Sequence, residues 1–294
     1  MQEHILQSQQ RERKLDLVCF GNPTVDTIIT PTQKHIRPGG AAMNTAAAFI
    51  GLSGKAGVIG RIGTDKIGNF LIEKMKEAGV DIKRLRVDDK PTFTNDIIVA
   101  PDKRDIICTN NYYGVDTLIG DDMDYILQSG AVLIGLRSKL FMECAEFTTK
   151  SGIPLYVSAH QYVTGASVLQ EIYLAQYNIE AVIGDDKEIN TMKRLCKTDP
   201  AVPLVITRGS TGSVFSFLKQ DVLVEAKSYK VNAVDPTGAG DAFAAGYIFA
   251  DMRGMGPAEC LALGNACGAI TVQGYGAQQP ITAEAVKALL GKTE

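Results

Sequence analysis

The sequence predicts an α/β fold, namely a doubly wound, mostly parallel sheet flanked by helices, with a small additional β element. Short apolar runs of strand length alternate with segments of helical periodicity from residue 15 to residue 273. Parallel strands joined by helices need crossover connections, which are right-handed and cover both faces of the sheet. A chain of 294 residues is long enough for one such domain and a small accessory element.

Composition excludes several classes of function. The 30 basic and 33 acidic residues give a net charge of −3 without a basic run, so we expect no nucleic-acid partner. No apolar run approaches the roughly 20 residues that span a bilayer, so we expect no membrane partner. Residues 1–14 are polar and lack the apolar core of a signal peptide, which predicts a flexible extension on a cytoplasmic protein. The six cysteines lack CxxC spacing and predict reduced thiols, with no zinc site or disulfide framework.

The first elements are a strand over Leu15–Phe20 and a second β-like run over Thr24–Thr30. Asp26 interrupts the second run, where an acidic residue either forms a turn or binds hydroxyl groups. The pair Gly39-Gly40 then introduces an alanine-rich helix. Small residues at this position suit tight helix–sheet packing, but they do not explain Asn44, a polar residue in an apolar helix start.

A strand over 55–62 is followed by a helix that Asp65 is predicted to cap. The pattern then changes, because two β-type runs at 92–100 and 105–114 flank the turn-like tetrapeptide 101–104. These runs predict a β hairpin inserted into the α/β alternation.

The middle of the chain resumes that alternation. We expect helices at 122–128, 139–150 and 167–177 and strands at 131–136, 153–158 and 179–183. Three carboxylates in four residues follow the last strand, between Asp185 and Glu188. They are typical of an acidic helix N-terminus that interacts favourably with the helix dipole.

A strand over 203–207 is followed by a turn at 208–212 and a hairpin formed by 214–217 and 222–225. Residues 231–234 read as the end of a further strand. Residues 237–240 are a glycine-rich turn, and a helix is expected from Asp241 onward. A last helix over 257–273 ends at the turn 274–277.

The strand, glycine-rich turn and helix N-terminus at 231–250 predict an anion site. Unpaired backbone N–H groups and the positive end of the helix dipole meet there, and glycines let an anion approach closely. Asp241 is either a helix cap or a carboxylate that accepts the proton of an incoming hydroxyl group. The second alternative, beside an anion site, is what phosphoryl transfer requires.

Two segments, DPTGAGDAFAAG at 235–246 and RPGGAAMNTA at 37–46, resemble the two signatures of the ribokinase-like, PfkB-type carbohydrate and nucleoside kinases. The similarity continues in family order over about residues 15 to 285. It implies a ribokinase-like kinase domain at 15–294, with lid strands near 24–36 and 92–114 that close over the substrate. It also implies ATP-dependent transfer of a phosphoryl group to a hydroxyl of a small molecule, with Mg²⁺.

The resemblance assigns roles to individual residues. It makes Asp241 the catalytic base and places Gly238, Ala239 and Gly240 in the catalytic turn, where the N–H groups of Ala239, Gly240 and Asp241 form the anion hole. The implied acceptor-binding residues are Asp26, Gly39, Gly40 and Asn44. The implied nucleotide-binding residues are Thr207, Gly209, Gly212, Asn265, Gly276 and Ala277. Glu188, with Asp185, is implied in binding Mg²⁺, partly through water, and Asp235 and Thr237 match ligands of a monovalent cation such as K⁺ in family members that use one.

One residue departs from the family pattern. The family has N-x-x-E where this chain has Asp185 to Glu188, so the asparagine position holds an aspartate. The acceptor is expected to be a sugar, a sugar acid or a nucleoside, and a homodimer formed through the lid is an expectation from the family. A non-catalytic protein that binds sugars or nucleotides on the same scaffold is the alternative from another class. A nicotinamide dehydrogenase is disfavoured because no G-x-G-x-x-G follows the first strand, and a P-loop kinase because no Walker-type motif is present.

Overall fold

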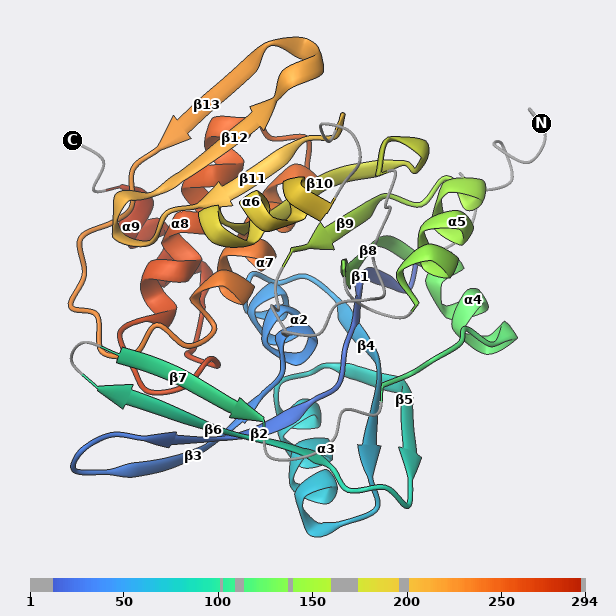
Figure 1. Cartoon of the computed structure of the whole chain (residues 1–294), viewed down its shortest axis with the longest axis vertical. Helices are drawn as coiled ribbons and strands as arrows, with labels where there is room; N and C mark the ends of the chain where they lie inside the picture. The colour runs from blue at the N-terminus through green and yellow to red at the C-terminus, as the bar shows by residue number, and fades with distance from the viewer. Residues whose placement is uncertain are drawn as a thin grey trace.

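The computed structural model describes residues 13–100, 103–108, 114–136, 140–159, 174–195 and 201–291. The described strands form a nine-stranded sheet and a separate four-stranded sheet. Figure 1 shows the four-stranded sheet at one end of the molecule, at the opposite end of the view from β12 and β13. The predicted α/β fold with a small additional β element is therefore confirmed.

The large sheet has the order β13-β12-β11-β10-β9-β8-β1-β4-β5. Its strands from β11 to β5 are parallel, whereas β12 and β13 run antiparallel at one edge. Because β1 lies between β4 and β8, the order of winding reverses at β1, and ligands of such sheets bind at the carboxyl ends of the strands near this reversal. The strands are β1 (Leu15–Phe20), β4 (Ala56–Gly63), β5 (Asp81–Asp88), β8 (Ser129–Gly135), β9 (Leu155–Ser158), β10 (Ile179–Asp185), β11 (Leu204–Thr207), β12 (Ser213–Phe217) and β13 (Val222–Ala226).

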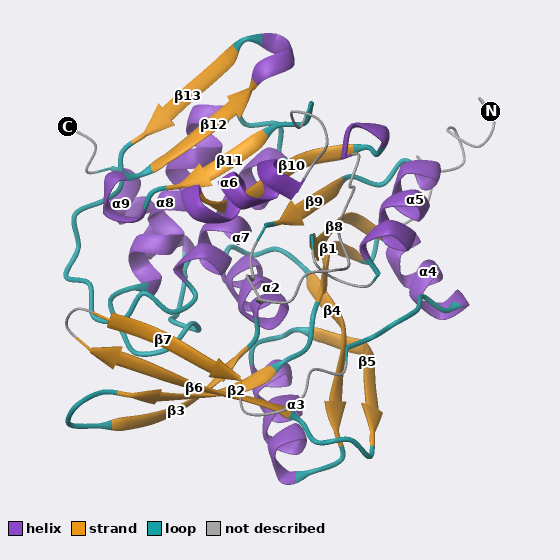
Figure 2. Cartoon of the chain, viewed as in Figure 1, coloured by secondary structure: helices purple, strands orange, loops and turns teal. Residues whose placement is uncertain are grey.

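Helices cover both faces of this sheet (Figure 2). Successive side chains of a strand point to opposite faces, so Leu17 and Cys19 of β1 join one buried cluster and Val18 joins the other. The first cluster receives residues of α2 (Ala41–Gly51), α3 (Lys66–Glu77), α7 (Ala239–Asp251), α8 (Pro257–Thr271) and α9 (Ala283–Leu290). The second receives residues of α4 (Gly120–Leu127), α5 (Phe141–Ser151) and α6 (Asp186–Leu195).

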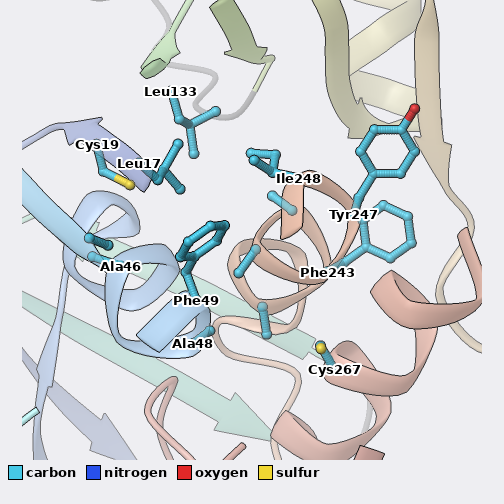
Figure 3. Close-up of a cluster of buried hydrophobic side chains, with 14 of the residues drawn as sticks. Leu17, Cys19, Ala46, Ala48, Phe49, Leu133, Phe243, Tyr247, Ile248 and Cys267 are labelled. Carbon is cyan, nitrogen blue, oxygen red and sulfur yellow. The ribbon is translucent and has the colours of Figure 1, made fainter. Parts of the chain in front are cut away.

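The first cluster holds α2 and α7 side by side. Phe49 of α2 and Ile248 of α7 are fully buried there (Figure 3), and each such side chain stabilises the fold by about 1.5–3 kcal/mol. Gly246 lets α8 approach α7, because a Cβ atom at Gly246 would lie 2.8 Å from the carbonyl oxygen of Leu263. The packing thereby fixes the N-termini of α2 and α7, which carry the two signature segments.

The small sheet has the order β3-β2-β6-β7. Its strands are β2 (Thr24–Ile29), β3 (Lys34–Gly39), β6 (Phe93–Ala100) and β7 (Lys103–Cys108). The predicted hairpin at 92–114 is confirmed as the antiparallel pair of β6 and β7, although residues 101–102 and 109–113 lie outside the described residues. In the register of the sheet, Asp26 of β2 pairs with Arg37 of β3 and Asn95 of β6.

Several sequence predictions about elements were wrong or fall outside the described residues. Residues 231–234 form a loop and no strand, and Val234 N–H donates to the carbonyl oxygen of Val272 (2.6 Å), outside any sheet. Helix α7 begins at Ala239, two residues earlier than predicted. The sequence analysis predicted neither β5 nor α9. In β5, apolar and charged residues do not alternate regularly. Residues 1–12 and 167–173 lie outside the described residues, and Leu174–Gln176 form a 3₁₀ turn (η1).

Candidate active site

The glycine-rich turn leads directly into α7. Gly238 is the residue before the helix and has φ of +77°, a conformation that favours glycine. A Cβ atom at Gly238 would lie 2.2 Å from the Cβ atom of Ala277, so the turn 274–277 packs against it. A Cβ atom at Gly240, by contrast, would have no heavy atom within 4 Å. The first turn of α7 is therefore supported on one side and open on the other.

The backbone donors of this turn suit an anion. Ala239 N–H donates to the carbonyl oxygen of Pro236 at 3.2 Å, and Gly240 is exposed in the first turn of the helix. The first N–H groups of a helix have no partner within the helix, and its dipole is positive at this end. The structure thus places the predicted residues Gly238, Ala239 and Gly240 together at one helix N-terminus, which is open at Gly240.

Asp241 lies in the same helical turn and is half-buried. The residue at the cap position is Gly238, so the structure does not assign Asp241 the role of N-cap. Its Oδ2 accepts a hydrogen bond from Asn44 Nδ2 of α2 at 2.8 Å, and Asn44 Oδ1 accepts one from Gln278 Nε2 at 3.3 Å. The two signature segments therefore meet at this carboxylate, although Asn44 and Asp241 are 197 residues apart in the chain. Gln278 was not predicted as a site residue, since a polar residue after a turn does not indicate by itself that it contacts the site.

Asp26 is 5% exposed and lies on β2 of the small sheet. Its Oδ1 accepts hydrogen bonds from Thr24 Oγ1 (2.8 Å) and from Asn95 Nδ2 (2.9 Å). A Cβ atom at Gly39 would lie 2.1 Å from Asp26 Oδ2, so only glycine fits beside this carboxylate. Asn95 was missed by the sequence analysis, because nothing in the β pattern of its strand indicates which face it occupies.

Gly40 is the residue before α2 and has φ of +94°. A Cβ atom there would lie 2.4 Å from the carbonyl oxygen of Asn22. The signature glycines therefore have a steric role in bringing the backbone of α2 close to β2, in addition to the acceptor contacts predicted for them.

Asp235 and Thr237 form a buried hydrogen-bonded unit. Asp235 Oδ1 accepts hydrogen bonds from Thr237 N–H (3.0 Å) and Thr237 Oγ1 (2.6 Å), and Asp235 Oδ2 accepts one from Gly276 N–H (2.9 Å). The Asp235 side chain is fully buried. A buried carboxylate with three donors ties the glycine-rich turn to the turn 274–277, where Gly276 and Ala277 lie.

Asp185 and Glu188 form a reciprocal cap at the start of α6. Asp185 N–H donates to Glu188 Oε2 (2.9 Å), and Glu188 N–H donates to Asp185 Oδ1 (2.7 Å). Aspartate and asparagine are equally good residues at this position, so the departure from the family pattern preserves the cap. Within the part of the chain that the structure describes, no group of three His, Cys, Asp or Glu side chains is arranged to hold a metal ion. Mg²⁺ usually takes only one or two carboxylates together with substrate phosphates, which this pair fits.

Three further predicted nucleotide residues lie along the neighbouring strands. Thr207 pairs with Asp185 in the parallel register of β11 and β10. Gly212 has φ of +114° and closes the turn after β11, where a Cβ atom would lie 2.0 Å from the carbonyl oxygen of Ala226. Gly209, in the same turn, has φ of +55° and open space around it.

Asn265 is 5% exposed on α8. Its Nδ2 donates to the carbonyl oxygens of Ala226 (3.3 Å) and Lys227 (3.2 Å). The amide group predicted to contact the nucleotide therefore binds the backbone that follows β13, which gives it a structural role in this form of the protein.

The small sheet also contacts the turn 274–277 directly. The ring of His35 on β3 stacks on Tyr275, with centroids 4.4 Å apart and an interplanar angle of 18°. Arg37 Nε donates to the carbonyl oxygen of Tyr275 at 3.3 Å. Neither contact could be predicted from the sequence, because the two segments lie about 238 residues apart in the chain.

The Cys19 thiol of β1 is fully buried. Burial, with a further contribution from the negative charge of Asp241, raises the pKa of the Cys19 thiol well above its usual range. Cys19, Cys144, Cys260 and Cys267 are all free and buried, as the cysteine spacing predicts for these four residues. None of the described helices is long and apolar enough to cross a bilayer.

Comparison with known proteins identifies related chains. Residues 14–284 match the family described as pfkB family carbohydrate kinase. The chain is 27% identical over 269 residues to an ATP-dependent ribose-1-phosphate kinase of Halopiger xanaduensis, with 86% of each chain covered. It is 23% identical over 327 residues to a 5-dehydro-2-deoxygluconokinase of Clostridium perfringens, covering 96% of this chain and 94% of that one. The fold resembles that of Arabidopsis thaliana ribokinase complexed with ribose and ATP, with a TM-score of 0.78, 21% identity and coverage of 95% and 99%.

Proposed function

This chain belongs to the pfkB family of carbohydrate kinases, and we propose that it transfers the γ-phosphoryl group of ATP to a hydroxyl of a sugar or sugar-like acceptor, with Asp241 as the base. The observation that carries the proposal is the hydrogen bond between Asn44 Nδ2 and Asp241 Oδ2. It holds a half-buried carboxylate in the same helical turn as the exposed backbone of Gly240. A base beside an anion site is the arrangement that phosphoryl transfer needs.

In the proposed reaction, the acceptor hydroxyl oxygen attacks the γ-phosphorus and its proton passes to the Asp241 carboxylate. A new O–P bond forms, the bond from the γ-phosphorus to the bridging oxygen breaks, and ADP leaves with the electron pair. N–H groups of Ala239, Gly240 and Asp241, in the turn that begins at Gly238, stabilise the charge of the transferring group. The open space at Gly240 supports this role, because a phosphate can reach the backbone there without meeting a side chain.

Asp26, Gly39, Gly40 and Asn44 bind and orient the acceptor in this proposal, and Asn95 supports Asp26. The Asp26 carboxylate, with hydrogen bonds from Thr24 and Asn95, is held rigidly enough to accept bonds from acceptor hydroxyls. The small sheet that carries Asp26 serves as a lid over the acceptor. Closing such a lid excludes water, which otherwise competes with the acceptor for the phosphoryl group.

The nucleotide lies along the carboxyl ends of β10 and β11 in the proposal. The residues assigned to it are Thr207, Gly209, Gly212, Asn265, Gly276 and Ala277. Glu188 and Asp185 would hold Mg²⁺, partly through water, and the ion neutralises charge on the phosphates when bound. A monovalent cation such as K⁺ beside Asp235 and Thr237 is part of the proposal, supported by the fully buried carboxylate of Asp235.

The outer face of the small sheet supports a homodimer formed through the lid. Ile36, Ile98 and Ile107 are 60%, 37% and 50% exposed. The registers place all three on one face, opposite to Asp26. Exposed apolar side chains gathered on one sheet face favour contact with a second copy. Free thiols and dependence on ATP support a cytoplasmic location.

The test is release of ADP from ATP and Mg²⁺ across sugars, sugar phosphates, sugar acids and nucleosides, with Asp241→Asn as the control. Loss of a positioned base lowers turnover by about 10²- to 10⁴-fold. The fold should persist, because asparagine is isosteric and Asp241 is only half-buried. An Asp241→Asn protein with wild-type turnover contradicts the assignment of the base. Binding of ATP or of a sugar without turnover by any acceptor favours the non-catalytic binding protein instead.

A further inference from the structure

Two basic residues of β3, His35 and Arg37, lie on the inner face of the small sheet. In the antiparallel register, Arg37 pairs with Asp26 and His35 pairs with Ile28. Directly paired residues share a face, with Cβ atoms about 4.5–5.5 Å apart. Both basic residues therefore share the face of the Asp26 carboxylate, and this face meets the turn 274–277 through Tyr275.

The guanidinium group of Arg37 is anchored but retains donors. A Cβ atom at Gly276 would lie 2.7 Å from Arg37 Cγ, so the aliphatic part of the side chain packs on that glycine. Nε donates to the carbonyl oxygen of Tyr275 (3.3 Å) and Nη1 to that of Ile36 (3.1 Å). A guanidinium group has five N–H donors, and carbonyl oxygens do not neutralise its charge. It can still form a paired hydrogen bond with a carboxylate or phosphate.

His35 supplies a second donor or acceptor beside it. Its ring is stacked on Tyr275, which fixes its plane. Its Nε2 atom is buried and has no hydrogen-bond partner in the described part of the chain. Buried polar atoms in proteins are nearly always hydrogen-bonded, so an unpaired one at a binding face points to a ligand atom.

The charges around the site indicate the chemical class of the ligand that Arg37 and His35 would bind. Asp26 and Asp241 put two carboxylates at the acceptor site, and these repel an anionic acceptor unless a cation lies nearby. Arg37 is a permanent cation on the same face as Asp26. We propose that the acceptor carries a phosphate or carboxylate group, which Arg37 binds with the help of His35 while the reacting hydroxyl faces Asp241. This inference rests on the proposed kinase function and narrows its substrate class to anionic sugar derivatives.

The phosphates of ATP are also anions that Arg37 could bind. Steady-state kinetics distinguish an anionic group on the acceptor from the phosphates of ATP. The assay compares ribose with ribose 1-phosphate and glucitol with gluconate, using the wild type, Arg37→Gln, Arg37→Lys and Lys34→Gln. Lys34→Gln is the matched control, since it removes one positive charge from the same strand but from the opposite face. A second variant, His35→Phe, keeps the stacked ring and removes Nε2.

We expect the wild type to prefer the anionic member of at least one pair. Arg37→Gln should raise KM for that acceptor by about 10- to 100-fold, as expected for loss of a charge-assisted pair. KM for ATP should stay within about 2-fold of the wild-type value. Arg37→Lys should recover part of the loss, and Lys34→Gln should behave as the wild type. His35→Phe should raise KM for the same acceptor by a smaller factor than Arg37→Gln does.

Three results would overturn the inference. The first is that the wild type prefers the neutral member of each pair. The second is that Arg37→Gln has the same KM for the anionic acceptor as the wild type. The third is that Arg37→Gln raises KM for ATP instead, which would assign Arg37 to the nucleotide. If no acceptor is phosphorylated, the kinase function fails, and calorimetric titration of the same ligands still decides the inference. Tighter binding of the anionic ligands by the wild type than by Arg37→Gln then supports an anion site, and equal binding refutes it.

Discussion

Gly240 and Gly238 lie two residues apart, and alanine at the two positions is expected to change stability in opposite directions. Gly240 is in the first turn of α7, and a Cβ atom there meets no heavy atom within 4 Å. Alanine is favoured over glycine in a helix by about 0.5–1 kcal/mol. Gly240→Ala should therefore raise the free energy of unfolding by up to about 1 kcal/mol, which is about 1–3 °C in Tm for a domain of this size.

The same methyl group should damage catalysis. In the proposed reaction it would occupy the space through which the transferred phosphoryl group approaches the backbone N–H groups. Loss of one such donor costs about 10²- to 10³-fold in turnover in other enzymes. We therefore expect a protein that is more stable than the wild type and has at least about 10²-fold lower kcat/KM.

Gly238→Ala provides the contrast. Its φ of +77° costs an L-residue about 1–2 kcal/mol, and the new Cβ atom would lie 2.2 Å from Ala277 Cβ. Overpacking adds about 1–3 kcal/mol, so the total loss of stability is about 2–5 kcal/mol. Thermal unfolding and ADP release measured on both variants test the reasoning. Wild-type kcat/KM in Gly240→Ala shows that no phosphate approaches this turn, and equal destabilisation of the two variants shows that Gly240 is not open.

Three further predictions concern residues around the site. Partial burial raises the pKa of the Asp65 carboxyl, but hydrogen bonds from Thr92 and Gly68 outweigh it and leave the pKa below its usual value. The stability from these bonds is present above the unfolded pKa of about 3.9 and is lost as pH falls through the lowered folded value. Asp65→Asn should thus lose about 0.5–1 kcal/mol at pH 7 by urea unfolding, and this loss should become smaller as pH falls below about 3.9. A difference that does not depend on pH contradicts this. Asp185→Asn should have the same free energy of unfolding as the wild type, because asparagine also caps a helix. Asp185→Ala should lower the free energy of unfolding by about 1 kcal/mol in the same assay. Equal stability of the two variants excludes the cap. Gln278→Leu removes the donor to Asn44 Oδ1 and should lower kcat about 2- to 10-fold with KM for ATP unchanged, and an unchanged kcat contradicts a positioning role.

The sequence by itself determined the fold class, most of the elements and the two segments that form the site. The period of the hydrophobic pattern depends only on residues close together in the chain. It was therefore enough to predict β1, β4, the strands from β8 to β11 and helix α7. The cap at Asp65 was also predicted correctly, since its partner Gly68 is three residues away. The loop at 231–234 was predicted as a strand because its residues suit one locally, whereas in the structure Val234 N–H donates to Val272, a residue distant in the chain.

Tertiary structure decided which side chains meet. Sequence analysis proposed Asn44 and Asp241 separately, but only the packing of α2 against α7 brings their side chains to 2.8 Å. The sequence analysis did not select Asn95 and Gln278, because an isolated polar residue in a strand or turn does not reveal which face it occupies or what lies opposite. Arg37 begins a signature segment, but that segment did not indicate that its side chain shares a face with Asp26. Contacts between distant segments depend on register and crossing of elements, which the whole core sets. That is why the reaction class follows from local motifs, whereas the charge of the acceptor is inferred from the structure of the small sheet.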